Sequence, residues 1–145
     1  MNMESVQIVA YSENIFNIPA DVNESLLKDK QVAVGINPVL RYKEGTDAVG
    51  CQMRVVYTLE GRQVMDYAAV VTVLVGGWNE MLKKVTDGKE IVAASKEAWV
   101  KTIDFVRGII CANANKTGNV AVARMMLPNV DIDKFLENVS IEKLS

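Results

Sequence analysis

The stretch AVGCQMRVVYTLEGRQVMDYAAVVTVLV, residues 48–75, decides the fold class of this chain. Apolar residues occupy every second position over Val49–Leu59, which is the period of a strand with one buried face. The dipeptide Glu60-Gly61 follows as a turn signal, and a second alternating run covers Met65–Val75. Residues 48–75 are therefore predicted to form one long β-hairpin.

Two further strands are predicted before the hairpin. The run Val32–Tyr42 alternates and leads through the turn Lys43–Asp47 into the hairpin. It contains Pro38, which lacks a backbone donor and therefore marks an edge, a bulge or a bend. The stretch Val6–Phe16 is rich in β-branched and aromatic residues, and residues 17–30 between the two strands are expected to be a loop. Four strands with hairpin-like connections predict an antiparallel sheet. In the last strand, Val70 and Leu74 on the second face suggest that both faces are covered near its end.

The second half of the chain changes to a helical period. From Ile91 onward apolar residues recur at intervals of three and four, behind a capping signal at Asp87–Glu90 and before a stop at Lys116–Gly118. This pattern predicts one helix of about 25 residues, longer than a common globular helix. A helix that outreaches its sheet is hard to bury in a monomer, so it indicates a subunit contact. An apolar stretch without a period follows, and a short helix is expected over Ile132–Val139.

The composition describes one soluble domain and disfavours several functions. The chain has 145 residues, half of them apolar, with 16 basic and 18 acidic side chains and no histidine. A net charge of −2 argues against electrostatic binding of nucleic acid or of an anionic membrane. The absence of histidine removes the commonest general base and most zinc sites. Cys51 and Cys111 show no metal or redox spacing, and although a disulfide between them stays open, they are expected to act as small core residues.

No set of catalytic residues is expected. Asp131 and Asp133 are the closest pair of carboxylates, but their place at the start of the short helix favours capping over acid–base chemistry. Asp66, alone among apolar strand residues, is expected to face solvent or a cross-strand partner. Gly76-Gly77 has no phosphate-loop frame around it and is expected to be a bend. We therefore expect no enzyme, no cofactor and no metal.

The chain shows no targeting signal. Residues 1–8 lack the basic and apolar regions of a secretory signal, and no apolar run is long enough for a membrane span. A cytoplasmic protein without membrane insertion is the expectation.

One feature indicates binding. The run of residues 119–128 is apolar yet aperiodic, and two adjacent methionines give it a soft, adaptable character. The alternative is that this run folds down on the sheet as core. Trp78, which directly follows the double glycine, is open to the same two interpretations.

The order of these parts resembles the SecB-like family. The resemblance covers nearly the whole chain, from about Val6 to Val139, and its most specific piece is Leu127–Phe135, with Arg107-Gly108 on the preceding helix. Gly76-Gly77 and the opening Tyr11–Phe16 are also similar to the family. The resemblance implies an α+β fold with a four-stranded antiparallel sheet, one long helix, an apolar crossover loop and a short C-terminal helix, all in a single domain over residues 1–145.

The resemblance also implies a function. SecB-like proteins are non-enzymatic chaperones that hold extended apolar segments of unfolded or nascent clients, and some relatives guard antitoxins. It implies a homo-oligomer, a dimer or a dimer of dimers with the long helices between two sheets. The positions that match the client-binding groove are Leu26, Leu27, Trp78, Val120, Val122, Met125, Met126 and Leu127.

The chain departs from the export chaperones of the family in its charge. Its charge is nearly balanced, and only a few residues follow the short helix, so contact with the translocase motor is less expected than in those chaperones, whereas a holding activity stays open. The expected partners are unfolded or nascent clients, with the translocase motor or an antitoxin as further candidates. Two alternatives stay open: an α+β protein that binds a small ligand, and a purely structural assembly module without holding activity.

Overall fold

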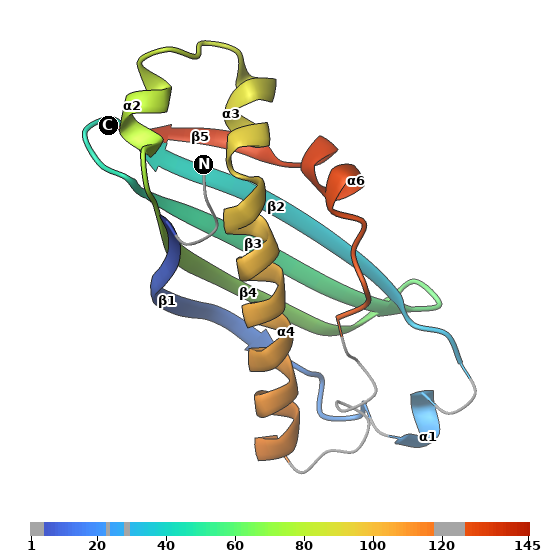
Figure 1. The fold of residues 1–145 in the computed structure, drawn as a ribbon. Coiled ribbons are helices and arrows are strands. Elements are labelled where there is room, and N and C mark those ends of the chain that lie inside the picture. Colours follow the sequence, from blue (N-terminus) through green and yellow to red (C-terminus); the bar gives the residue numbers. More distant parts are fainter. Residues whose placement is uncertain (1–4, 23, 28–29, 118–126) are drawn as a thin grey trace.

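The computed structural model describes residues 5–22, 24–27, 30–117 and 127–145. Its strands form one five-stranded sheet in the order β1-β4-β3-β2-β5. The helices α2, α3, α4 and α6 lie on one face of this sheet, and α4 runs obliquely across it (Figure 1). The protein is therefore an α+β structure of two layers, and the predicted fold class is confirmed.

The predicted hairpin is the centre of the sheet. Strand β3 (Ala48–Leu59) pairs antiparallel with β4 (Arg62–Val75), with Cys51 opposite Val71. The two connecting residues, Glu60 and Gly61, have φ of 51° and 80°. Positive φ at both positions is the turn that matches the twist of two antiparallel strands, and glycine adopts it without a side-chain penalty.

The two strands predicted upstream flank the hairpin. Strand β1 (Val6–Asn17) pairs with β4, and β2 (Ala33–Lys43) pairs with β3. Pro38 pairs with Met53 of β3 on one side, and the pairing of β2 with β5 begins only at the next residue, Val39. Among the described strands, β3 is thus the one neighbour of β2 at Pro38. Of the edge, bulge or bend that its missing N–H predicted, the structure shows an edge position.

A fifth strand was missed by the sequence analysis. Strand β5 (Ser140–Leu144) runs parallel to β2, with Ile141 beside Leu40. The sheet is therefore mixed, with four antiparallel strands and one parallel edge strand. All residues of β5 are exposed, so the strand has no buried face that would give its sequence a readable period.

The predicted single long helix is two helices. After the short α2 (Trp78–Leu82), helix α3 (Gly88–Ala94) ends at Ser95, and α4 (Lys96–Thr117) begins directly after it. The Ser95 hydroxyl donates to the Val92 carbonyl at 2.6 Å, and the Ser95 N–H bonds the same oxygen. Serine that bonds its own backbone in this way competes with helix continuation, which explains the break. Asp87 caps α3 by accepting from the Lys89 N–H at 3.0 Å.

Two further short helices lie in the described residues. Helix α1 (Glu24–Leu27) lies within residues 17–30, where the sequence predicts a loop. Helix α6 (Ile132–Glu137) is the predicted C-terminal helix, two residues shorter than expected. The Asp131 carboxylate accepts from the Asp133 and Lys134 backbone N–H groups at 3.1 and 3.4 Å, so the predicted capping role is confirmed.

The core lies between the sheet and α4. Trp99, Val106 and Ile110 of α4 are fully buried against inward residues of the hairpin such as Cys51 and Tyr67. The opposite face of the sheet carries no helix in the described residues. There Val70 is half-buried and Leu74 is 39% exposed, so the expectation that both faces are covered is corrected. Among the described residues, no helix combines the length and the apolar character needed to cross a membrane.

Candidate client-binding surface

The predicted groove residues other than Trp78 fall into three groups. Val120, Val122, Met125 and Met126 lie outside the described residues, and their role stays a prediction. Leu27 and Leu127 are each 3% exposed and belong to the hydrophobic core, while Leu26 is half-buried against that core. Leu27 and Leu127 therefore do not offer open apolar surface on this chain.

Trp78 is separated from the other predicted groove residues. Its side chain is 0% exposed and packs edge to face on Tyr42, with ring centroids 6.3 Å apart. Helix α2, which begins at Trp78, lies near the arrowhead of β2, whereas α1 lies near the start of that strand (Figure 1). Trp78 is thus a core residue of one end of the sheet, as the second interpretation of its sequence position held.

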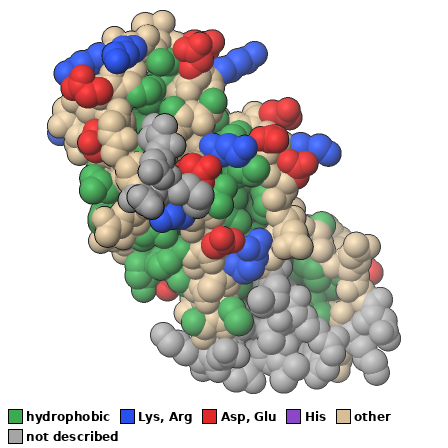
Figure 2. Space-filling model, in the orientation of Figure 1, with side chains coloured by type: hydrophobic (Ala, Val, Ile, Leu, Met, Phe, Trp, Pro, Cys, Tyr) green, Lys and Arg blue, Asp and Glu red, His purple; other side chains and the backbone are tan. Residues whose placement is uncertain are grey.

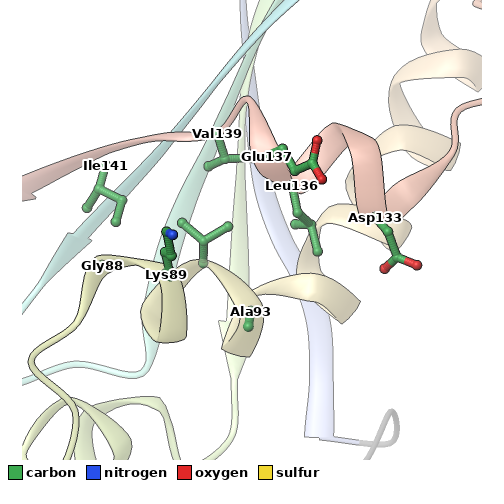
Figure 3. Close-up of a pocket in the computed structure, with 9 residues that line it drawn as sticks. Gly88, Lys89, Ala93, Asp133, Leu136, Glu137, Val139 and Ile141 are labelled. Atoms are coloured by element: carbon green, nitrogen blue, oxygen red, sulfur yellow. The ribbon is translucent and has the colours of Figure 1, made fainter.

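An apolar cavity lies elsewhere among the described residues, between α3 and the segment from α6 to β5. Its volume is about 490 Å³, and it is lined by Gly88, Lys89, Val92, Ala93, Asp133, Leu136, Glu137, Val139 and Ile141. Leu136, Val139 and Ile141 point toward α3 across this space (Figure 3). The cavity thus combines aliphatic walls with three charged side chains, the composition of a site that binds an apolar group and orients it by a few polar contacts.

Helix α6 is held over α4 by contacts on two sides. The Phe135 ring packs edge to face on Trp99, with centroids 5.1 Å apart, and both side chains are buried. On the exposed side, the Lys96 ammonium lies 3.5 Å from the Asp133 carboxylate. Because the Phe135 side chain fills the core, its neighbour Leu136 is directed to the half-buried position that lines the cavity.

Arg107 of α4 fixes the chain where it enters the C-terminal segment. Its Nε donates to the Leu127 carbonyl at 3.2 Å, and its Nη2 donates to the Pro128 carbonyl at 3.0 Å. Its Nη1 donates to Asp104 on the same helix at 3.0 Å. The planar guanidinium thus spans two successive backbone carbonyls and ties the return of the chain to α4.

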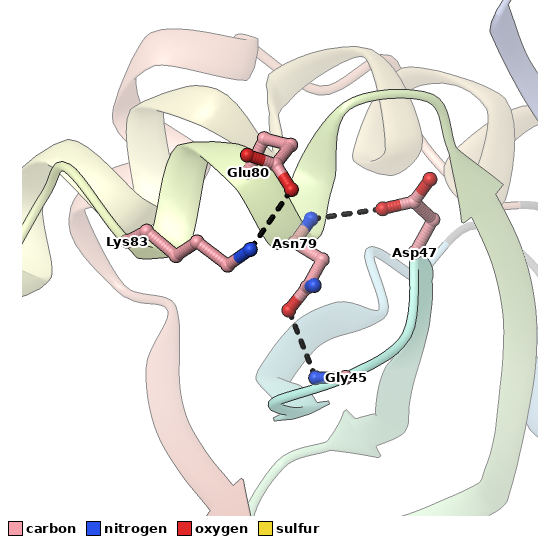
Figure 4. A network of polar contacts seen from close by, with 5 residues as sticks. All are labelled: Gly45, Asp47, Asn79, Glu80 and Lys83. Carbon is pink, nitrogen blue, oxygen red and sulfur yellow. Dashed lines mark hydrogen bonds and ion pairs between the residues drawn. The ribbon is translucent and has the colours of Figure 1, made fainter.

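A polar network fixes the far end of the sheet. The Asn79 side-chain oxygen accepts from the Gly45 N–H, and the Asn79 N–H donates to the Asp47 carboxylate, both at 2.8 Å (Figure 4). Glu80 and Lys83 pair on the exposed side of α2 at 3.0 Å. Asp47 therefore caps α2 from the β2–β3 turn, and the network has a structural role in joining these elements.

Buried titratable groups in the described part of the chain are held in their protonated or paired forms. Burial raises the pKa of the Cys51 thiol to about 12, against a weaker opposing hydrogen bond from Thr102. Burial likewise raises the pKa of Tyr57 to about 12. Asp66, predicted to find a cross-strand partner, accepts from Arg54 Nε and Nη2 at 3.1 and 2.7 Å. The Cys51 thiol and the Tyr57 hydroxyl are thus protonated at neutral pH.

The edge strand β1 carries the most exposed apolar residues of the described chain. Val9 and Tyr11 are 54% and 56% exposed, and the Tyr11 ring packs edge to face on Phe105 of α4, with centroids 5.1 Å apart. Hydrophobic side chains are visible between charged ones over the helix-bearing face (Figure 2). Large exposed apolar residues beside an unpaired strand edge are typical of an interaction surface.

Comparison with known proteins places the fold. No protein-family model matches the chain, and no curated protein sequence matches it. Its architecture is that of the SecB-like fold. The structure is similar to that of the Mycobacterium tuberculosis Rv1957 SecB-like chaperone, solved in complex with a ChAD peptide from the Rv1956 HigA1 antitoxin. The TM-score is 0.50 at 8% sequence identity, and the match covers 80% of this chain and 83% of that one. The resemblance stated from the sequence is therefore supported at the level of the fold.

The sequence does not predict the apolar cavity. Of the residues that line it, Asp133 is predicted as a capping residue and Val139 as the end of the short helix, whereas the sequence assigns no role to Ile141. The local sequence signal for the cavity consists of two short apolar patterns, Phe135-Leu136 before Glu137 and Val139 with Ile141 after it. Which of these residues face one another depends on the packing of α3 against β5, which no local pattern reveals.

Proposed function

We propose that this protein is a non-enzymatic SecB-like chaperone that holds extended apolar segments of unfolded client proteins. The observation that carries the proposal is the apolar cavity between α3, α6 and β5, in a chain with the fold of a peptide-binding chaperone. Each apolar client side chain that leaves water gains about 25 cal/mol per Å² of buried surface, independent of its sequence. Such a gain suits a protein that accepts many unfolded chains.

The side chains that line the cavity among the described residues suit a binding role. Its charged side chains are Lys89, Asp133 and Glu137, and Asp133 is already paired with Lys96. The buried Cys51 thiol faces the core and stays protonated at neutral pH. Antitoxin-like segments that are unfolded when free are candidate clients, in line with the peptide held by the structural neighbour.

The proposed chaperone is a homo-oligomer, a dimer or a dimer of dimers. Strand β1 is long, its outer edge is unpaired within the described residues, and Val9 and Tyr11 are exposed along it. Natural proteins seldom leave such an edge free, because it is a template for pairing with another chain. The mass of wild type by light scattering tests this, with Tyr11→Lys expected to shift it toward the monomer.

The decisive experiment measures suppression of aggregation. Citrate synthase diluted from guanidinium chloride is the client, and its light scattering is followed with and without the protein. Leu136→Ser is expected to lower the suppression several-fold, because it places a hydroxyl in the aliphatic wall of the cavity. Leu74→Ser is the matched control, since Leu74 is a partly exposed leucine on the helix-free face. Equal suppression by both variants and wild type would remove the cavity from the proposal.

A small-ligand-binding protein is the second candidate function. The cavity volume of about 490 Å³ falls in the range of small-molecule sites. Saturable binding of one metabolite, lost in Leu136→Ser without any effect of unfolded protein, would favour this candidate. Competition between an unfolded client and such a ligand would instead assign both to one site.

A further inference from the structure

Strand β5 is the most weakly held part of the sheet. All five of its residues are exposed, and Ile141 and Leu144 are each 36% exposed despite their apolar side chains. It pairs with β2 alone among the described strands, and in the parallel sense, which is slightly less stable per residue than antiparallel pairing. Strand β5 thus has little burial to keep it in place.

The side chains that hold β5 are surface contacts. The Lys143 ammonium bonds the Glu44 carboxylate at 2.7 Å, and Arg41 Nε lies 3.6 Å from Glu142, with all four side chains at least one-third exposed. Ion pairs of this kind contribute little to stability. The Ile141 side chain reaches α3, where a Cβ on Gly88 would lie 3.2 Å from its Cδ1. Glycine at this position therefore makes room for the one apolar side chain that β5 inserts.

The same strand closes the apolar cavity. Ile141 lies on the helix-bearing face, beside the buried Leu40 of β2, and lines the cavity together with Val92 of α3. Its side chain points toward α3 (Figure 3). If β5 leaves, the edge of β2 over Val39–Lys43 and the space taken by Ile141 become one continuous groove. Such a groove offers backbone hydrogen bonds from the strand edge and an aliphatic pocket for an alternate side chain, the two elements of peptide recognition by strand addition.

We propose that β5 occupies the place of a client strand and is displaced when an extended client segment pairs with the edge of β2. The proposal rests on the proposed function and names its mode of binding. The occupant is defined by the segment now seated there, Ser-Ile-Glu-Lys-Leu, residues 140–144. A client segment therefore needs an aliphatic residue at the position of Ile141, flanked by polar or charged residues that face Arg41 and Glu44.

Displacement has a cost that sets the affinity. The observed dissociation constant for a client equals the intrinsic constant divided by the fraction of molecules in which β5 is released. Removing β5 is therefore expected to tighten client binding, and locking it in place to weaken binding. Removal is expected to tighten binding about tenfold, which corresponds to release of β5 in about one molecule in ten, and the lock, which takes that fraction toward zero, is expected to weaken binding by more than tenfold.

The test uses a reversible disulfide lock in the full chain. Arg41 and Glu142 are register partners on the helix-free face, and neighbouring strands lie at a spacing that a disulfide can span. The variant Arg41→Cys/Glu142→Cys is made with Cys111→Ser, so that the half-buried native thiol does not compete. The client is fluorescently labelled, reduced and carboxymethylated α-lactalbumin, and binding is measured by anisotropy before and after reduction of the lock. The reduced form of the same chain is the control.

Two further measurements complete the test. A chain lacking residues 140–145 is expected to bind the client about tenfold more tightly than wild type, and to bind a synthetic peptide of residues 138–145. In wild type, addition of client is expected to speed hydrogen exchange at the backbone amides of Ile141–Leu144. The lock measurement does not depend on whether the shortened chain folds.

The outcomes separate the two proposals. Weaker client binding by the oxidised lock, restored on reduction, supports displacement of β5. Equal binding by the oxidised and reduced forms overturns displacement and leaves the holding function intact. If neither wild type nor any variant binds the client or suppresses aggregation, the proposed function itself fails, and the displacement mechanism fails with it.

Discussion

Arg107 is expected to be the main polar contact that holds the C-terminal segment on α4, and its replacement tests this. In Arg107→Met the aliphatic part of the side chain is retained, whereas the hydrogen bonds to the Leu127 and Pro128 carbonyls and the pair with Asp104 are lost. The Leu127 carbonyl is partly buried, so its bond to a charged donor is worth about 1.5 kcal/mol. The exposed bond to Pro128 adds ~0.5 kcal/mol. The exposed pair with Asp104 adds ~0.3 kcal/mol.

The free energy of unfolding of Arg107→Met should therefore fall by about 2 kcal/mol. With an m-value of ~2 kcal/mol/M for a chain of this size, the urea midpoint falls by about 1 M while m stays unchanged. Urea titrations followed by tryptophan fluorescence measure this, at one fixed protein concentration because assembly would make stability depend on it. Trp99 reports on the core directly beneath α6.

Two matched variants sharpen the Arg107 experiment. Asp104→Ala removes only the exposed pair and should lower stability by less than about 0.5 kcal/mol. Arg107→Lys can reach one carbonyl with a single ammonium and should fall between the two, at about 1 kcal/mol. If Arg107→Met and Asp104→Ala have the same midpoint, the two carbonyl bonds do not hold the segment and the reasoning is refuted.

Three further predictions concern the core, the thiols and the edge strand. Trp78→Ala should lower the free energy of unfolding in urea by about 3–5 kcal/mol, because the side chain is fully buried. Trp78→Phe should lower it far less, because this change also removes a buried indole N–H that has no partner among the described residues. Burial raises the pKa of Cys51 to about 12, so in the native state at pH 8 this thiol should resist dithionitrobenzoate while Cys111 reacts. Both thiols should react in guanidinium chloride. Rapid reaction of two thiols in the native protein would contradict this prediction. The hydrogen bond from Lys143 holds the pKa of the Glu44 carboxyl below its ordinary value. The stabilisation of β5 by this pair is therefore fully present when the pH is above the ordinary pKa of Glu44, and it is lost as the pH falls through the lowered pKa. Hydrogen exchange at β5, corrected for the intrinsic rate, should therefore increase at acidic pH in wild type and increase less in Glu44→Gln, which retains only the pair between Arg41 and Glu142.

The sheet could be predicted from the sequence because its central strands have one buried face. The alternation over residues 48–75 reflects burial of residues such as Met53 and Val73, and the turn residues Glu60 and Gly61 set the register of the hairpin. The capping role of Asp131 could be predicted for a similar reason, because its bonds run to N–H groups two and three residues away. Interactions of this kind leave a local pattern.

The break between α3 and α4 shows where a periodic pattern is insufficient. The apolar period continues through Ser95, because Val92 and Trp99 lie on the same buried side. The helix nevertheless ends there, since the Ser95 hydroxyl and N–H both bond the Val92 carbonyl. Hydrophobic period reports which side of a helix is buried, and a local backbone hydrogen bond decides where the helix ends.

The residue sequence alone determined the two-layer α+β class, the hairpin at its centre and the absence of an imidazole, since each follows from composition or from contacts between near neighbours. Only the tertiary structure decided that residues 140–144 form a strand and that Leu136 and Ile141 share a cavity with Val92. The physical reason is that β5 is held by β2, a partner about a hundred residues earlier in the chain, and has no buried face of its own. Pairing with so distant a partner leaves no period in residues 140–144, and the cavity arises only where the paired segments meet.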